Sequence, residues 1–173
     1  MFSWLSDLLE RFADLIPLPV IVRKDQVMLE AVMGSHVREF SGRFLIMWEL
    51  IASYEFINLG RHNGEVDQDL FIETGDQIRA LKITTSFGWE PIDCIKMALK
   101  CENYEVTAAS MVQIANARLN RETGLLPTDE SVMAEADELL DKYGMRLTDL
   151  SITGQSPTRS IHHSGGIEIV GLQ

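Results

Sequence analysis

The chain has 173 residues, of which 46% are hydrophobic and 24% charged, a composition typical of a globular protein and not of a disordered one. Its 26 acidic and 15 basic residues give a formal charge of −11. A chain with this charge repels phosphate backbones, so we expect no nucleic-acid partner. The apolar stretches are shorter than the ~20 residues that span a bilayer, and no basic segment precedes an apolar run as it does in a signal peptide. These features favour a cytoplasmic protein.

Residues 1–16 predict an amphipathic helix, which ends before Pro17 because proline disfavours a helical conformation in the preceding residue. Bulky apolar side chains recur at helical spacing, and charged residues occupy the other side. Such a stripe can insert in the plane of a membrane interface, or it can pack on protein, either on its own chain or on the same helix of a neighbouring subunit. The stripe consists of Phe2, Trp4, Leu5, Leu8, Leu9, Phe12, Leu15 and Ile16.

Residues 17–90 predict a β-rich lobe, because their apolar residues recur mainly with a period of two. The residues Thr74-Gly75-Asp76 have the composition of a hairpin turn. The segment after that turn alternates as a long strand with one buried face. Within this lobe, the apolar run "FLIMW" at residues 44–48 is either a buried core strand or a second surface for apolar contact.

Residues 91–155 predict a helical lobe. A short first helix begins near Pro91, since proline is favoured at the start of a helix. The second helix spans residues 103–122, with Asn103 as its N-cap and Gly124 after its end. Its predicted apolar positions are Val106, Met111, Ile114, Ala115 and Leu119.

A third helix begins at Thr128 or Asp129 and ends at Gly144. The stretch "MRLTDLSI" after it alternates, which predicts a strand that closes the helical lobe. Residues 156–173 are a glycine-rich tail with one short, apolar, strand-like piece. This order of strands followed by helices predicts an α+β chain.

No sequence motif of catalytic or phosphate-binding type occurs, so we predict a non-enzymatic protein without a cofactor, and a hydrolase is the weakest alternative. The pair His162-His163 has no Cys or Asp at ligand spacing, so we predict no metal site. Cys94 and Cys101 are seven residues apart on one face of a predicted helix. We expect them to be buried small hydrophobes in a reducing compartment.

Four stretches together resemble an SPFH domain, the band-seven family of stomatin, prohibitin and flotillin. The first is "VIVRKDQVMLEAVMGSHVREFSGRFLIMWEL", which is similar to the strand pair and glycine turn that open the family's domain. The second, "DLFIETGDQIRALKITTSFGW", resembles its turn and long alternating strand. The third, "DCIKMALKCENYEVTAASMVQIANARLN", is the most specific, and "LDKYGMRLTDLSI" is similar to the family's helix–glycine–strand ending. The match covers residues 17–155.

The resemblance implies a β-rich SPFH lobe at residues 17–90 and an α/β lobe at 91–155, in which a parallel strand returns to the sheet. It also implies self-association into rings or patches, with residues 103–122 meeting the neighbouring subunit. Because the sequence has no heptad run, we expect a compact form that lacks the family's coiled coil. The residues that we assign to the subunit interface are Tyr104, Met111, Gln113, Asn116 and Arg118.

Two functions follow from these expectations. In the first, the protein is a scaffold on the cytoplasmic face of a membrane, held there through its N-terminal helix and its contact with the lipid bilayer. In the second, the same fold is a soluble oligomeric adaptor or shell-forming module, which regulates a membrane protease or organises another assembly. In both, the main partner is a second copy of the chain.

Overall fold

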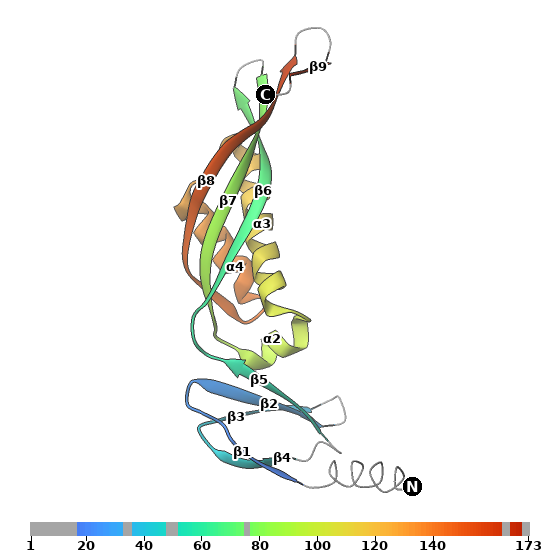
Figure 1. The fold of residues 1–173 in the computed structure, drawn as a ribbon, viewed down its shortest axis with the longest axis vertical. Helices are drawn as coiled ribbons and strands as arrows, with labels where there is room; N and C mark the ends of the chain where they lie inside the picture. The colour runs from blue at the N-terminus through green and yellow to red at the C-terminus, as the bar shows by residue number, and fades with distance from the viewer. Residues whose placement is uncertain (1–16, 33–35, 48–51, 75–76, 164–166, 171–173) are drawn as a thin grey trace, which may run out of the picture. The chain divides into compact units, whose positions relative to one another are not determined.

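The computed structural model is an α+β protein, as the sequence predicts, with three helices and antiparallel sheets in the part of the chain that it describes (Figure 1). The predicted helix of residues 1–16 and the tryptophan of "FLIMW", Trp48, lie outside that part. The described residues are 17–32, 36–47, 52–74, 77–163 and 167–170.

The chain divides into two compact units. Unit 1 comprises residues 1–60 and 93–99, and unit 2 comprises residues 61–92 and 100–173. This division differs from the predicted boundary near residue 90, because the two long strands before that position pair with the strand that follows the helices. Their hydrogen bonds make them part of the helical unit.

Unit 1 contains a two-stranded sheet, β1–β4, and a three-stranded sheet in the order β3-β2-β5. Buried Val22, Met28 and Met47 form a hydrophobic cluster, on which Leu45 and Tyr54 also pack. Residues 94–99 of the helix α2 (Cys94–Lys100) also belong to this unit. The strands are β1 (Leu18–Ile21), β2 (Gln26–Val32), β3 (His36–Ser41), β4 (Phe44–Met47) and β5 (Ala52–Asn58).

Unit 2 consists of one antiparallel sheet, in the order β6-β7-β8-β9, with α3 and α4 side by side on one face (Figure 1). Alanines and valines dominate the inward faces of both helices, for example Ala108, Val112 and Ala136, and these small side chains let the helices lie close to the sheet. The elements are β6 (His62–Thr74), β7 (Gln77–Pro91), α3 (Tyr104–Thr123), α4 (Asp129–Asp141), β8 (Met145–His163) and β9 (Ile167–Val170).

Both ends of α3 and the start of α4 lie where the sequence predicts them, whereas α4 ends at Asp141, before the predicted end at Gly144. Asn103 is the N-cap of α3, and its side chain accepts a hydrogen bond from the amide of Val106 at 3.1 Å. Gly124 follows α3 in the left-handed conformation, with φ 66°, which glycine adopts without steric cost. At the start of α4, Thr128 and Ser131 form a reciprocal capping box.

The predicted parallel return of the last strand is wrong, because β8 pairs with β7 in the antiparallel sense. The reason is the helix pair between them. Since α3 and α4 form an antiparallel hairpin, the chain comes back to the end of the sheet where β7 finished. There the amide of Ile92 donates to the carbonyl of Gly144 at 2.9 Å, and β8 starts beside the end of β7.

β8 also extends further than predicted. The strand continues to His163, so it includes the first eight residues of the predicted tail, and Ile167–Val170 form the strand-like piece as β9. Three register shifts interrupt its pairing with β7. The register leaves Thr148, Thr153 and Thr158 without a partner residue in β7, so the bulges recur at intervals of five residues.

The free edge of β6 is covered by side chains of α3. The amide group of Asn120 accepts a hydrogen bond from the N–H of Phe71 at 3.3 Å and donates to the carbonyl of Phe71 at 2.8 Å and to that of Leu125 at 2.9 Å. Gln113 donates to the carbonyl of Asp67 at 3.3 Å. These side chains take the place of a neighbouring strand.

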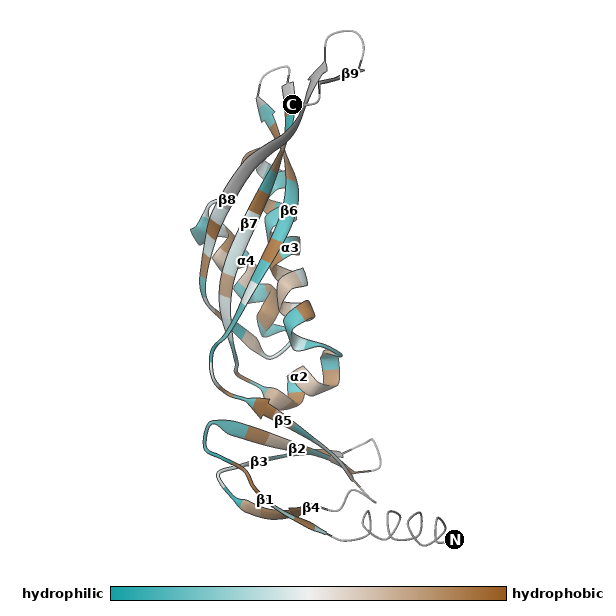
Figure 2. Cartoon of the chain, in the orientation of Figure 1, coloured by the Kyte–Doolittle hydropathy of each residue, from teal (hydrophilic) through white to brown (hydrophobic). Residues whose placement is uncertain are grey.

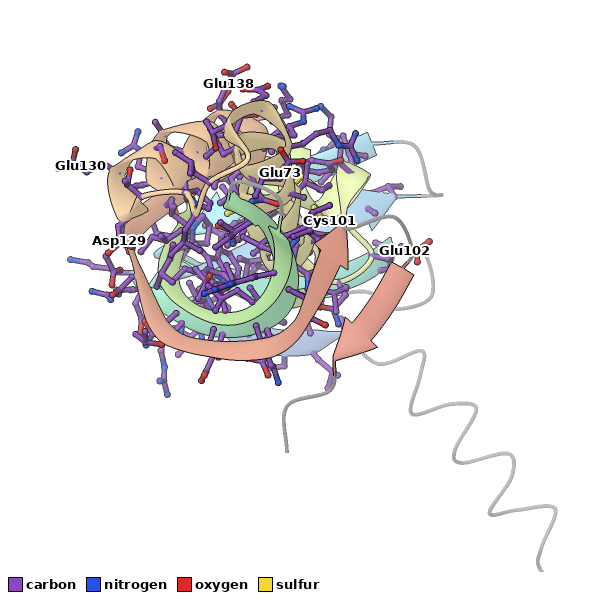
Figure 3. All side chains as sticks on the ribbon, turned by 90° about the horizontal axis from the view of Figure 1, so that it is seen from above. Glu73, Cys101, Glu102, Asp129, Glu130 and Glu138 are labelled. Atoms are coloured by element: carbon purple, nitrogen blue, oxygen red, sulfur yellow. The ribbon has the colours of Figure 1, made fainter. Side chains whose placement is uncertain are left out.

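On the opposite edge of the sheet, carboxylates of α4 accept hydrogen bonds from backbone amides of β8. Asp137 accepts from the amide of Leu147 at 2.9 Å, and Asp129 accepts from the amide of Ile152 at 3.1 Å. Asp129 lies at the start of α4 beside β8, whereas Glu130 and Glu138 on the same helix point outward (Figure 3). Each long helix therefore satisfies backbone groups on the edge that it covers.

We expect Asn120→Leu to lower the free energy of unfolding by about 2–4 kcal/mol, because it removes the side-chain partners of the N–H and C=O of Phe71 and one of the two donors to the carbonyl of Leu125. Asn120→Asp keeps the acceptor for the N–H of Phe71 but turns a carboxylate toward the carbonyls of Phe71 and Leu125, so its loss should be at least as large. Urea denaturation monitored by circular dichroism measures both. The control is Asn63→Ala, an exposed asparagine of the same strand pair. Equal midpoints for all variants would show that α3 does not hold the edge.

Candidate functional site

The sheet β1–β4 is apolar on both faces, since its two strands read LPVI and FLIM. One face packs on the core of unit 1, where Met47 is 8% exposed. The opposite face, which we call the outer ribbon face, consists of Pro19, Ile21, Phe44 and Ile46. Figure 2 shows the hydrophobic colouring that continues over β1 and β4.

The side chains of the outer ribbon face are unusually accessible for their type. Ile21 is 73% exposed, Phe44 is 64% exposed and Ile46 is 59% exposed. Ile21 lies opposite Phe44 in the antiparallel register, and Pro19 lies opposite Ile46, so all four residues share one face. A contiguous exposed apolar face on a small sheet is typical of a contact surface for protein or membrane. The sequence pattern left "FLIMW" open between core and contact; in the structure Leu45 and Met47 pack on the core, whereas Phe44 and Ile46 are exposed.

Three exposed basic residues adjoin one end of this face. Arg23 and Lys24 follow β1, and Arg43 precedes β4. The amide of Val22 donates to the carbonyl of Arg43 at 2.9 Å, so Arg43 directly follows the Ile21–Phe44 pair along the ribbon. Of the described residues, none forms an ion pair with these three.

The turn at Gly42 brings the basic residues together. Gly42 has φ 60°, a conformation that favours glycine, and a Cβ placed on it would lie 3.8 Å from Cγ of Lys24. Lys24 therefore lies beside the residue that precedes Arg43. The next residue in the first turn, Asp25, is the one acidic residue among residues 17–29. The local balance is positive, in a chain whose net charge is −11.

The two units differ in charge. Unit 1 has six basic and nine acidic residues, and unit 2 has nine basic and seventeen acidic residues, so their formal charges are −3 and −8. Most of the negative charge of the chain thus belongs to unit 2. The long-range repulsion of anions by the whole chain is compatible with a basic surface on unit 1, because salt screens charges beyond about 8 Å at physiological ionic strength.

The structure changes the predicted subunit interface on α3 in one respect. Asn116 is 0% exposed and donates to the hydroxyl of Thr85 at 3.3 Å, so it belongs to the core of unit 2 and is not available to a neighbour. Tyr104, Met111 and Gln113 are half-buried. Arg118 is exposed and donates to Glu135 of α4 at 2.8 Å.

The apolar face of α3 is also rotated from the predicted one. Val106 is 61% exposed and Ile114 is 40% exposed, whereas Asn116 and Asn120 are buried. The reason is that two asparagines lie on the inward side of α3: Asn120 provides hydrogen bonds to Phe71 at the edge of β6, and Asn116 donates to the hydroxyl of Thr85 in β7. Two predicted core positions, Val106 and Ile114, therefore lie on the outer surface of α3.

Unit 2 contains a groove of about 550 Å³ between β6 and the end of α3. Its lining includes Phe71, Asn120 and Arg121, and the exposed side chains of Asp69 and Glu73 adjoin it. Among the described residues, no group of three or more His, Cys, Asp or Glu side chains could hold a metal ion.

The two cysteines are free and buried, as predicted. Burial, with the nearby charges of Glu39 and Asp93, raises the pKa of the Cys94 thiol to about 11. Burial also raises the pKa of Cys101. Both groups therefore stay protonated at neutral pH, and neither has the properties of a reactive thiol.

We expect Cys94 to resist alkylation in the folded protein. A pKa of about 11 in place of 9.0 lowers the thiolate fraction at pH 8 roughly 100-fold, and the thiol is 4% exposed. Iodoacetamide labelling followed by peptide mass spectrometry should show slow labelling at pH 8, with full labelling in urea as the control. Rapid labelling of Cys94 in the native protein would mean that α2 opens readily from unit 1.

None of the described helices is long and apolar enough to cross a membrane. No family model matches the sequence, and no curated protein matches it significantly.

Proposed function

We propose that this protein is a non-enzymatic SPFH-type scaffold that self-associates into rings or patches on the cytoplasmic face of a membrane. The observation that carries the proposal is the outer ribbon face, an exposed apolar surface that begins at Pro19, directly after the segment predicted to be an amphipathic helix. Two apolar surfaces that are adjacent in the chain favour one common environment. A membrane interface accommodates both.

The order of the elements supports the SPFH part of the proposal. The first matched stretch corresponds to β1–β4, the second to the β6–β7 hairpin, the third to α2 and α3, and the fourth to the end of α4 and the start of β8. The chain thus has a β-rich part followed by a helical part, the arrangement that the resemblance implies. The antiparallel return of β8 departs from the parallel strand that the resemblance implies.

The attachment combines weak contacts. The helix of residues 1–16 would insert its apolar stripe, including Trp4 and Phe12, and the outer ribbon face would rest on the same interface. A single amphipathic helix binds reversibly. In a ring or patch, each further subunit binds at high effective concentration, so that many weak contacts give stable attachment.

The outer surface of α3 is the proposed contact between subunits. It presents Val106 and Ile114 to solvent, with Met111 half-buried between them. Tyr104 and Arg118 belong to the same helix and remain assigned to this contact. Since the helices cover the edges of the sheet in unit 2, we propose that neighbours meet through side chains of α3 and not by adding strands.

The second candidate is a soluble oligomeric adaptor or shell-forming module that regulates a membrane protease or organises another assembly. One observation favours it: Phe71 is 55% exposed beside the groove between β6 and α3, and Leu125 is 58% exposed. Such a surface fits a protein partner. In this case the helix of residues 1–16 would pack on protein and not on lipid.

The two candidates predict different results in vesicle flotation. We expect the full chain to float with vesicles as particles of many subunits, and the double variant Trp4→Ser and Phe12→Ser to lose most flotation without a change in melting temperature. Light scattering records the particle mass. Val106→Ser with Ile114→Ser should lower that mass, and Phe56→Ser, on unit 1, is the control.

If Trp4→Ser with Phe12→Ser keeps its flotation but melts at a lower temperature, the N-terminal helix packs on protein. A full chain that does not float but forms large particles would support the soluble module. A monomeric full chain would contradict both candidates.

A further inference from the structure

The outer ribbon face and the three cations at its end form one surface with two chemistries. Ile21 and Phe44 form the residue pair of the outer ribbon face that adjoins Arg43 along the ribbon, and all three residues are exposed. We propose that this surface binds an anionic phospholipid bilayer, with Ile21, Phe44 and Ile46 in the interface and Arg23, Lys24 and Arg43 on the headgroups. The inference rests on the proposed membrane attachment and specifies the lipid class.

The apolar and basic residues have complementary tasks at such a surface. Apolar side chains contribute to binding on any bilayer, whether neutral or anionic, because insertion removes them from water. Each exposed cation near an anionic surface raises partitioning about fivefold, so three cations give roughly 100-fold. The cations therefore determine selectivity, while Ile21 and Phe44 determine general affinity.

Because the rest of the chain is acidic, binding to an anionic bilayer requires a local cluster of basic residues. With a formal charge of −11, the protein as a whole is repelled by an anionic surface. That repulsion is screened beyond about 8 Å, whereas Arg23, Lys24 and Arg43 act at contact distance. They lie beside an apolar face that can bring them to the headgroups.

Two other occupants of the outer ribbon face are less favourable. A second copy that bound through the same face in a symmetric dimer would offer these cations only apolar residues and its own cations, and no anionic partner. Nucleic acid would meet the cations but would leave Ile21 and Phe44 without an apolar partner. An anionic bilayer offers both kinds of contact at once.

The test is flotation of the full chain with vesicles of phosphatidylcholine alone and with vesicles that contain about 30% phosphatidylserine. We expect the wild type to partition at least tenfold more strongly to the anionic vesicles. The triple variant Arg23→Gln, Lys24→Gln and Arg43→Gln should lose roughly 100-fold on anionic vesicles and change little on neutral ones. Salt at about 0.5 M should weaken the binding of the wild type to anionic vesicles but should not weaken that of the triple variant.

Matched variants test whether vesicle binding depends on where a residue lies and not only on its type. Arg43→Gln should lose about fivefold on anionic vesicles, and Arg38→Gln, an exposed arginine of β3 that lies outside the ribbon, should lose less than twofold. Ile21→Ser with Phe44→Ser should weaken binding to both vesicle types. Phe56→Ser, on β5, should weaken neither.

Several outcomes would overturn the inference. Equal binding of the wild type to both vesicle types, unchanged in the triple variant, would overturn it and leave membrane attachment intact. No binding to either vesicle type would overturn both. If Ile21→Ser with Phe44→Ser lowers the particle mass in lipid-free buffer, a second copy covers the face. If that variant floats normally but melts at a lower temperature, the protein's own chain covers it.

Discussion

The hydrogen bonds between the side chain of Asn120 and the backbone of Phe71 are the interaction on which unit 2 depends. They fix α3 along the edge of β6, and with α3 in place the hairpin to α4 returns the chain to Gly144, where β8 begins. Asp137 and Asp129 then bind the free edge of β8 in the same way. Backbone groups on both edges of this sheet are thus bonded to side chains of its own helices, which opposes the addition of a further strand there.

Unit 1 follows a different constraint, which is the small size of its two-stranded sheet. A ribbon of two strands is not stable alone, so one face must pack on a core, and Met47 does so. The other face then stays in water unless something covers it. Because all eight residues of the two strands are apolar, this face is hydrophobic too. Arg43 and Lys24 at its end add positive charge, which would favour an anionic binding partner over a neutral one.

Local signals in the sequence predicted local structure. Asn103, Gly124 and Thr128 each satisfy helix-terminal groups a few residues away, so both ends of α3 and the start of α4 could be predicted. Asn120 contacts a strand 49 residues earlier, and no local pattern indicates such a partner. In "FLIM" every residue is apolar, so a period of two cannot show which face is buried. The outer ribbon face therefore required the three-dimensional register.

The bulges of β8 have a further consequence for folding. β8 pairs with β7 only after the chain has passed through three helices, so the two strands meet late, as distant partners. A long regular ladder could then align in several shifted ways, each with most of its hydrogen bonds. Thr148, Thr153 and Thr158 remove that freedom, because a strand displaced by one residue would place all three bulges against the wrong partners. The spacing of these threonines thus selects a single register between β7 and β8.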